Sequence, residues 1–519
     1  MHTPVDHTTS PATPGRLRAL VRFRSWLAAG DAGPWVITLV FLLLLPFSVP
    51  RVALSDEVQY YAYLRSVYFD RDLDFRNEYE HFAAQAERFG DQAITRALLR
   101  EDAMNPNPRT GLLRNVAPVG AAILWAPGFV LADMAVGLAN ALGANLPRDG
   151  YGRAYIVATC MMSALYSLLG LLLTYRLARR YSDDFAATVA TLTVFLASSL
   201  VFYSIILMPW SHAPGFFLFA LFLTVWMRHW RRPLERGLGT WMALGLIGGL
   251  MVMTREQLGL LLIIPALEAL WTYGVLAAGS SGGPPLRTAP QRRDHQAAFV
   301  AEERWRAALG LAGRHAAFLV TLGVTLTPQL LAYQILNGRP GPSPTVASKF
   351  IWSSPNFLNT LIDPGRGAFV WAPVLALGLL GLLWLARRDA LLAGLLLAGF
   401  LAQTYINGAF GTTWHLRGAF GFRRLIECTP IFVVGLATFL AWLQPRAGRW
   451  PILIGAVALV AWNIGLIAQF TFIRPEVIRR ELVWNDMLYY QLVEVPRQVV
   501  EKLWTLLFDR CRLMTNQTC

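Results

Sequence analysis

Two adjacent carboxylates stand where a side chain could act as a general base. Asp56 and Glu57 directly follow the first long apolar run of the sequence and precede Tyr60 and Tyr61. A carboxylate at the edge of a membrane is partly desolvated, which raises its basicity and suits it to take a proton from a hydroxyl. Glu57 could orient that hydroxyl or bind a divalent cation such as Mg²⁺ or Mn²⁺. The alternative is structural, because an acidic pair after Ser55 also caps a helix.

Basic side chains gather in two later loops between apolar runs. The members of this set are His415, Arg417, Arg423 and Arg424 in the loop 409–425, and Lys349 and Arg366 in the loop 337–366. Converging guanidinium groups bind phosphate through charge-assisted and often bidentate hydrogen bonds. The sequence therefore predicts a lipid-phosphate site. The alternative is that these cations pair with acids of the first loop or with lipid headgroups in general.

Two further polar positions interrupt apolar sequence. Arg255 and Glu256 stand between two apolar runs, and charges at such positions usually have a partner or a function. His212 opens an apolar run after Pro209-Trp210-Ser211. Together with Tyr60 and Tyr61, we treat Arg255 and His212 as candidate substrate contacts. Their structural alternatives are an ion pair at a helical hairpin for Arg255 and a polar helix cap for His212.

The composition excludes a soluble enzyme. The chain has 519 residues with 46 Lys+Arg and 32 Asp+Glu, a net charge of +14, and only 15% of its residues are charged. About 25% is usual for soluble proteins. The apolar residues gather in runs long enough to cross a bilayer as helices. The basic residues flank these runs, so they indicate membrane topology, and no nucleic-acid partner is expected.

The runs predict an all-α polytopic membrane protein with about 11 transmembrane helices, in a range of 10 to 13. The predicted spans are 34–50, 151–177, 185–205, 213–230, 237–253, 258–277, 316–336, 367–385, 389–407, 426–443 and 451–472. The corresponding regions are a cytoplasmic basic terminus (1–33), a transmembrane domain (34–475) and an extracytoplasmic amphipathic tail (476–519). The transmembrane domain contains a long first extracytoplasmic loop with juxtamembrane elements (53–150) and a cytoplasmic loop (279–315).

One apolar segment, 116–142, is ambiguous. If it crossed the membrane, the cluster around Arg179 and every later arginine cluster would lie outside the cell, against the positive-inside rule. We therefore predict that it is juxtamembrane or re-entrant, and a crossing segment remains the alternative. Cys511 and Cys519 in the tail could form a disulfide, which the sequence leaves open.

Three stretches resemble segments of known membrane enzymes. They are Asn115–Gly120, Asp363–Pro373 and Phe420–Leu425. With the acidic pair after the first helix and the long first loop, the chain resembles the GT-C glycosyltransferase superfamily over about residues 34–475. The nearest likeness is to bacterial dolichyl-phosphate-mannose-protein mannosyltransferase-like and aminoarabinose-transferase-like proteins.

The resemblance implies transfer of a sugar from a polyprenyl-phosphate donor to a glycan, lipid or protein acceptor, usually with inversion. It places Asp56 as the base, Glu57 beside the acceptor or a cation, and the basic set at the departing lipid phosphate. The reaction would occur outside the cytoplasm on a protein of the inner (plasma) membrane. Many members carry a further acid in the next short outer loop, where this chain has only His212 at 206–212. Dependence on a divalent cation therefore stays open.

Two other classes remain as alternatives. A lipid-glycan flippase or transporter would also be basic and polytopic, and it would place charges along a central cavity. An O-antigen-type polymerase or ligase would use a lipid-linked donor with a large late outer loop. This sequence instead concentrates its polar side chains at one predicted face, which favours the glycosyltransferase.

Overall fold

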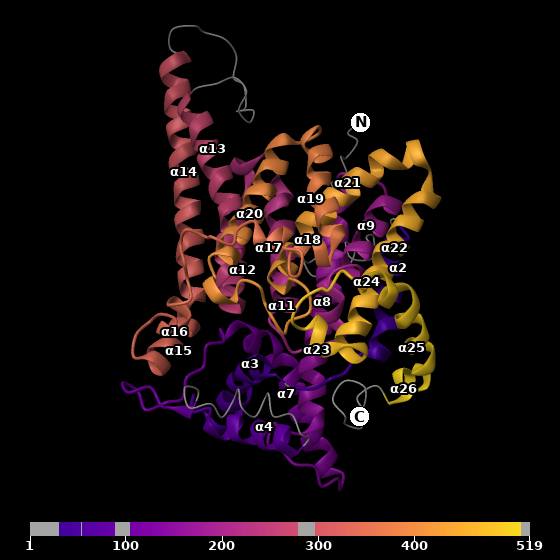
Figure 1. Cartoon of the computed structure of the whole chain (residues 1–519). Helices are drawn as coiled ribbons and strands as arrows, with labels where there is room; N and C mark the ends of the chain where they lie inside the picture. Colours follow the sequence, from indigo (N-terminus) through magenta and orange to yellow (C-terminus); the bar gives the residue numbers. More distant parts are fainter. Residues whose placement is uncertain (1–30, 53, 89–103, 279–295, 510–519) are drawn as a thin grey trace, which may run out of the picture.

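The computed structural model describes residues 31–52, 54–88, 104–278 and 296–509, and within these ranges the regular structure is helical (Figure 1). Eleven long helices coincide with the eleven predicted runs. Their bounds are α2 (Gly33–Leu44), α8 (Arg153–Ala178), α9 (Asp184–Leu196), α11 (His212–Trp226), α12 (Leu238–Thr254), α13 (Ile263–Ala278), α14 (Gln296–Thr325), α19 (Pro373–Ala386), α20 (Ala390–Gly408), α21 (Thr429–Ala447) and α22 (Arg449–Ala468).

Among the described residues, seven helices are long and apolar enough to cross a membrane, or eight if the bent pair Asp184–Leu196 and Ser199–Ile206 forms one span. Three shorter apolar helices are Gly33–Phe47, Leu238–Thr254 and Pro373–Ala386. These helices are those of a multi-pass membrane protein. The predictions for residues 1–30 and for a Cys511–Cys519 disulfide lie outside the described residues.

Short helices join the long ones at the end of the bundle that carries α3 and α4, which we call the first-loop end (Figure 1). The first loop contains α3 (Ser55–Arg65), α4 (Arg76–Arg88) and α7 (Gly120–Ala141). Later connections contribute η6 (Glu256–Leu262), α15 (Thr327–Asn337), α16 (Pro344–Ala347), α17 (Asn359–Ile362), α18 (Ala368–Trp371), η7 (Gly411–Thr413) and η8 (Arg423–Cys428). After α22 come α23 (Pro475–Ile478), α24 (Met487–Tyr489), α25 (Val495–Glu501) and α26 (Leu503–Phe508).

Helix α21 forms the centre of the bundle, where it packs against α19, α9 and α8. A Cβ on Gly381 would lie 2.2 Å from the carbonyl oxygen of Gly435, and a Cβ on Gly435 would lie 2.0 Å from that of Gly378. Only glycine permits this approach of α19 to α21, and small residues are the usual means by which membrane helices pack closely. The core thus fixes the start of α21, which follows the site segment η8 directly.

Basic segments that the sequence assigns to the cytoplasm meet at the opposite end of the bundle. Arg179 pairs with Asp31 at 3.0 Å, and Arg231 pairs with Asp389 at 2.8 Å. Arg388 donates to the carbonyl of Tyr181 at 2.6 Å. These contacts join chain segments around residues 31, 180, 230 and 388 at one end of the bundle.

Helix α7 is the ambiguous apolar segment, and by length and composition it could cross a membrane. Just before it, the N–H of Val116 donates to Gln59 of α3 at 2.9 Å. In its second half, Asp133 accepts from Tyr155 in the first turn of α8 at 2.8 Å. Helix α7 is therefore tied to α3 and to the start of α8. That 116–142 does not cross the membrane stays a prediction.

Asp133 is the anchor between α7 and α8. It is 2% exposed and accepts from Tyr155, from Tyr68 at 2.9 Å and from Arg148 at 2.8 and 2.6 Å. Asp133→Ala would leave the buried Tyr155 hydroxyl without this acceptor. We expect the free energy of unfolding to fall by about 2–4 kcal/mol. Thermal unfolding in detergent measures this loss, with Glu80→Ala at an exposed position as the control, and equal stability of the two variants would contradict the anchor.

Candidate functional site

The acidic pair begins helix α3. The backbone N–H of Leu54 donates to a carboxylate oxygen of Glu57 at 3.0 Å, which closes the first turn as in a capping box. The negative charges of two acids in the first turn also interact favourably with the positive end of the helix dipole. The other oxygen of Glu57 accepts from the Trp210 indole N–H at 2.7 Å, and Glu57 is 1% exposed. Glu57 therefore fixes the start of the helix on which Asp56 stands.

Asp56 remains accessible beside a guanidinium. Its side chain is 46% exposed, and one carboxylate oxygen lies 3.2 Å from Nη2 of Arg423. Arg423 is 20% exposed and its guanidinium stacks over the Trp210 ring, 4.0 Å from the ring centre. The pair thus holds one oxygen of Asp56 in place while the carboxylate stays open to solvent or ligand.

Three consecutive residues, Trp210, Ser211 and His212, connect the parts of the site. Trp210 donates to Glu57, and the Ser211 hydroxyl donates to the Tyr60 hydroxyl oxygen at 2.9 Å. The Nδ1 atom of His212 lies 2.9 Å from a carboxylate oxygen of Glu427. The three residues at the start of α11 therefore bridge α3 and η8, which are far apart in the sequence.

Glu427 of η8 is the centre of a buried cluster. Glu427 is 1% exposed, and the same carboxylate oxygen that faces His212 lies 3.1 Å from Nε of Arg255. Arg255 also donates to the Ser211 hydroxyl at 3.2 Å. His212 is fully buried, and its Nε2 atom has no hydrogen-bond partner among the described residues. The cluster holds Arg255 in place from two sides.

Arg424 extends to the other side of η8. Its guanidinium stacks over the Phe410 ring at 4.0 Å and donates to the carbonyl of Thr413 at 3.3 Å. It lies within electrostatic range of Arg423 and Arg255. Arg423 pairs with Asp56 and Arg255 with Glu427, whereas no carboxylate pairs with Arg424 in the described part of the chain. The site therefore has one cation that an incoming anion could neutralise.

Arg366 lies in a different environment. Its guanidinium donates to backbone carbonyls of Ala419 at 3.3 Å and Arg480 at 2.6 Å, and also to that of Arg479. Burial, followed by the nearby positive charge of Arg417, lowers its pKa to about 10. Arg366 thus fastens the segment after α23 to the loop before η8. Its predicted phosphate contact stays a prediction, although these carbonyls already occupy its donors.

The remaining basic residues lie nearer the surface. Arg417 is exposed, and its backbone N–H donates to Nδ1 of His415 at 3.1 Å. Lys349 is exposed on the segment after α16. The next residue, Phe350, packs on Phe410 with ring centres 4.3 Å apart, which places Lys349 beside the Arg424 stack. The structure brings Arg423, Arg424 and Arg255 to Asp56, and it groups Arg417 with Arg366.

The two tyrosines after the acidic pair point to different places. Tyr60 is 7% exposed, contacts Ser211 in the site, and has its pKa raised by burial, so its phenol stays neutral. Tyr61 is fully buried and donates to the carbonyl of Gly150 at 2.6 Å, inside the first-loop core. Tyr60 therefore belongs to the site, while the structure does not bring Tyr61 to it.

A metal ion does not fit Glu57. One of its carboxylate oxygens accepts from Trp210 and the other from the backbone of Leu54, so neither faces a cavity. Within the described ranges, no three His, Cys, Asp or Glu side chains are grouped as metal ligands. We therefore derive no step through a metal.

Sequence reasoning missed Trp210, Ser211 and Glu427. The signal for Glu427 was present, because it is an acid in an apolar run only three residues after Arg424. A buried acid requires a cationic partner, and Arg255 and His212 are the polar groups that interrupt apolar sequence elsewhere. Trp210 and Ser211 carried no comparable signal, because neither is charged.

Removal of the charge on Glu427 is expected to disturb the cluster. Glu427→Gln leaves the half-buried guanidinium of Arg255 without the carboxylate that lies 3.1 Å from it, and a charge that loses its partner away from water is destabilising. We expect the free energy of unfolding to fall by about 2 kcal/mol. Thermal unfolding measures it, with Glu476→Gln at an exposed position as the control. Unchanged stability of Glu427→Gln would mean that the cluster does not depend on charge.

No protein-family model and no curated protein matches the sequence. In shape, the chain is similar to the oligosaccharyltransferase AglB from Archaeoglobus fulgidus in complex with an inhibitory peptide and a dolichol-phosphate, with 11% identity, a TM-score of 0.44, and coverage of 83% of this chain and 54% of that chain. It is also similar to the Archaeoglobus fulgidus enzyme tethered with an acceptor peptide containing the NVT sequon, with 13% identity, a TM-score of 0.44, and coverage of 88% and 55%.

Both are structures of an oligosaccharyltransferase. The chain spans little more than half of their length. At this identity and TM-score, the similarity does not establish a shared activity. The function is therefore argued from the site itself.

Proposed function

We propose that this protein is a membrane glycosyltransferase that moves a sugar from a polyprenyl-phosphate donor to a glycan, lipid or protein acceptor, with Asp56 as general base. The observation that carries the proposal is an accessible carboxylate, Asp56, beside the half-buried arginines of η8 and near Arg255, at one end of an apolar bundle. A base next to a site for a departing anion is what glycosyl transfer from a lipid phosphate requires.

In the proposed reaction, the acceptor hydroxyl lies against the open face of Asp56. Its O–H bond breaks, the proton goes to the carboxylate, and the oxygen forms the new bond to the anomeric carbon. The bond from that carbon to the phosphate oxygen breaks, and its electron pair leaves with the phosphate. Attack from the face opposite to the leaving group inverts the anomeric centre. Arg423 holds Asp56 in position for this proton transfer.

Negative charge develops on the departing phosphate oxygen. Arg424, which has no described carboxylate partner, would bind the phosphate directly, with Arg255 beside it. Fixed cations that already stand where charge appears stabilise a transition state most strongly where water is scarce. The neutral phenol of Tyr60 adds a donor next to Arg255 and Ser211.

We further propose that the site faces the outside of the cytoplasmic (inner) membrane. The supporting observation is that the arginine-rich segments meet at the end of the bundle opposite to the site, with Arg179 and Arg231 in ion pairs there. Positive residues concentrate on the cytoplasmic side of membrane proteins. A donor carried by a lipid would reach the site laterally from the outer leaflet.

The test uses purified protein in lipid vesicles with a panel of radiolabelled polyprenyl-phosphate sugars. The proposal expects one donor to be consumed with release of polyprenyl phosphate. Movement of a donor between leaflets without release of polyprenyl phosphate would contradict the proposal and indicate a flippase. Release of polyprenyl diphosphate from a diphosphate donor would instead indicate the polymerase or ligase class.

A further inference from the structure

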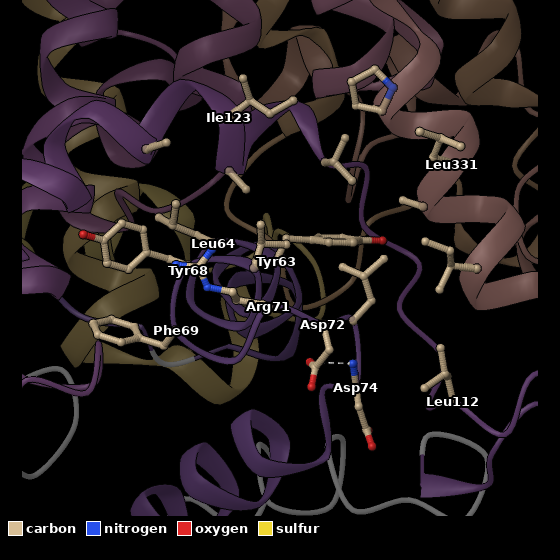
Figure 2. Close-up of a pocket in the computed structure, with 18 of the residues that line it drawn as sticks. Tyr63, Leu64, Tyr68, Phe69, Arg71, Asp72, Asp74, Leu112, Ile123 and Leu331 are labelled. Atoms are coloured by element: carbon tan, nitrogen blue, oxygen red, sulfur yellow. Dashed lines mark hydrogen bonds between the residues drawn. The ribbon is translucent and has the colours of Figure 1, made fainter.

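A separate groove lies between α7 and α15, with Tyr63 and Leu64 of α3 at its inner wall (Figure 2). Its volume is about 1250 Å³. Pockets for small molecules usually hold about 300–1,000 Å³. The lining includes neither Asp56 nor the arginines of the site. The groove therefore lies apart from the candidate site, and it is large enough for a ligand such as a lipid.

One part of this groove is apolar. Ile123 of α7 and Leu331 of α15 lie at the same end of the view in Figure 2, and Ile335 lines the same wall. Leu331 is 56% exposed and Ile335 is 48% exposed. Helix α15 is the last part of the candidate membrane span Glu302–Asn337. This part of the groove is thus continuous with a surface suited to hydrocarbon, and an apolar chain could enter it from the bilayer.

The other part of the groove carries charge. Figure 2 shows Asp72 and Asp74 away from Ile123 and Leu331, with Arg71 nearby. All three are exposed, and no ion pair joins Arg71 to a carboxylate in the described part of the chain. One oxygen of Asp72 accepts from the Ser66 hydroxyl at 2.8 Å and from the backbone N–H of Asp74 at 3.1 Å, and its second oxygen has no hydrogen-bond partner among the described residues. This rim therefore offers one cation and two anions.

A buried hydroxyl without a described hydrogen-bond partner lies between the two parts of the groove. Tyr63 is 3% exposed, and its hydroxyl has no hydrogen-bond partner among the described residues. A buried hydroxyl left unpaired costs about 1–3 kcal/mol. Tyr63 lines the groove, so a ligand that supplies an acceptor there would remove this cost. The expected ligand has a polar acceptor between an apolar part and a charged head.

We propose that the groove binds one membrane phospholipid with a zwitterionic head that carries a phosphate and an ammonium group. Its acyl chains would lie against α7 and α15, and an ester carbonyl would accept from Tyr63. Its phosphate would contact Arg71, and its ammonium group would contact Asp72 and Asp74. An anionic head would fit less well, since the two carboxylates would repel it.

This lipid is not the reacting donor. Its head lies beyond the C-terminal end of α3, whereas Asp56 lies in the first turn. At about 1.5 Å per residue, the helix separates them by more than about 10 Å. The lipid would instead fill the space between the first loop and α15 and hold α3 in place. The proposal is independent of the proposed function, because lipid binding is measured without turnover.

Native mass spectrometry of the full chain in detergent tests the proposal, with phosphatidylethanolamine and phosphatidylglycerol added in turn. We expect one phosphatidylethanolamine to be retained at least about tenfold better than phosphatidylglycerol. Arg71→Asn and Ala332→Phe should each lower this retention at least about tenfold. Arg71 has a φ of 62°, a conformation that asparagine tolerates, so Arg71→Asn leaves the backbone unstrained. Arg76→Asn and Leu138→Phe, at exposed positions outside the groove, are the matched controls.

Two outcomes would overturn the proposal. Equal retention of both phospholipids, unchanged in Arg71→Asn, would show that the rim does not select a head. If polyprenyl phosphate displaced phosphatidylethanolamine, and if this displacement were lost in Ala332→Phe but kept in Arg424→Gln, the groove would bind the lipid-phosphate sugar donor instead.

Discussion

Asp56→Asn is expected to abolish sugar transfer while leaving the donor bound. Asparagine keeps the shape of the side chain and its contact with Arg423, but it cannot take a proton from an acceptor hydroxyl. General base catalysis contributes about 10²–10⁴-fold to a rate, so turnover should fall by a factor in that range. The measurement is release of polyprenyl phosphate from labelled donor under single-turnover conditions, together with binding of the same donor.

The matched control is Glu80→Gln, an exposed acid of the same loop that lies outside the site and outside the groove. It should transfer sugar at close to the wild-type rate. If Asp56→Asn kept more than about a tenth of the wild-type rate, another group would have to be the base. Equal loss in both variants would point to a general requirement for negative charge in the first loop.

Arg424→Gln is expected to slow turnover by about 10²–10³-fold, the usual cost of removing one donor to a developing anion. Arg424 stacks on Phe410 and lacks a described carboxylate partner, so its charge is available to the departing phosphate. The loss should appear mainly in kcat, because the charge on the phosphate grows as the bond to the sugar breaks. Steady-state kinetics with a saturating acceptor would measure kcat and KM separately.

Arg417→Gln is the matched control for Arg424→Gln, because both arginines belong to the same loop and the sequence predicts both as phosphate ligands. Arg417 is exposed and lies near Arg366, whose guanidinium is held by backbone carbonyls. We expect Arg417→Gln to leave kcat within a few-fold of the wild-type value. A larger loss in Arg417→Gln than in Arg424→Gln would move the phosphate site to the loop around Arg366.

The arrangement of apolar runs predicts most of the fold because the hydrocarbon of a bilayer restricts the secondary structures that a chain can form. A backbone in a bilayer must form its own hydrogen bonds, so each run of sufficient length becomes a helix. The eleven predicted runs accordingly coincide with helices. Length and composition do not fix how many of them cross. Helix α7 is long and apolar enough to cross, although the arginine pattern of the sequence predicts that it does not.

The candidate site could be predicted only where charge gave a signal. The charged residues beside apolar runs are Asp56, Arg423 and Arg424, and charges at such positions usually have a partner or a function. The sequence could not distinguish Arg366, whose donors are occupied by carbonyls, from Arg424, since that difference depends on contacts between distant segments. The same reason hid Trp210, which joins Glu57 to the site only because the chain folds back on α3.

The most direct test of the account is to locate the lipid phosphate by cryo-electron microscopy of the protein with bound polyprenyl phosphate. The account expects the phosphate within about 4 Å of the guanidinium groups of Arg424 and Arg255, on the side that faces Asp56. A phosphate bound at Arg417 and Arg366, or in the groove beside Arg71, would contradict the proposed site.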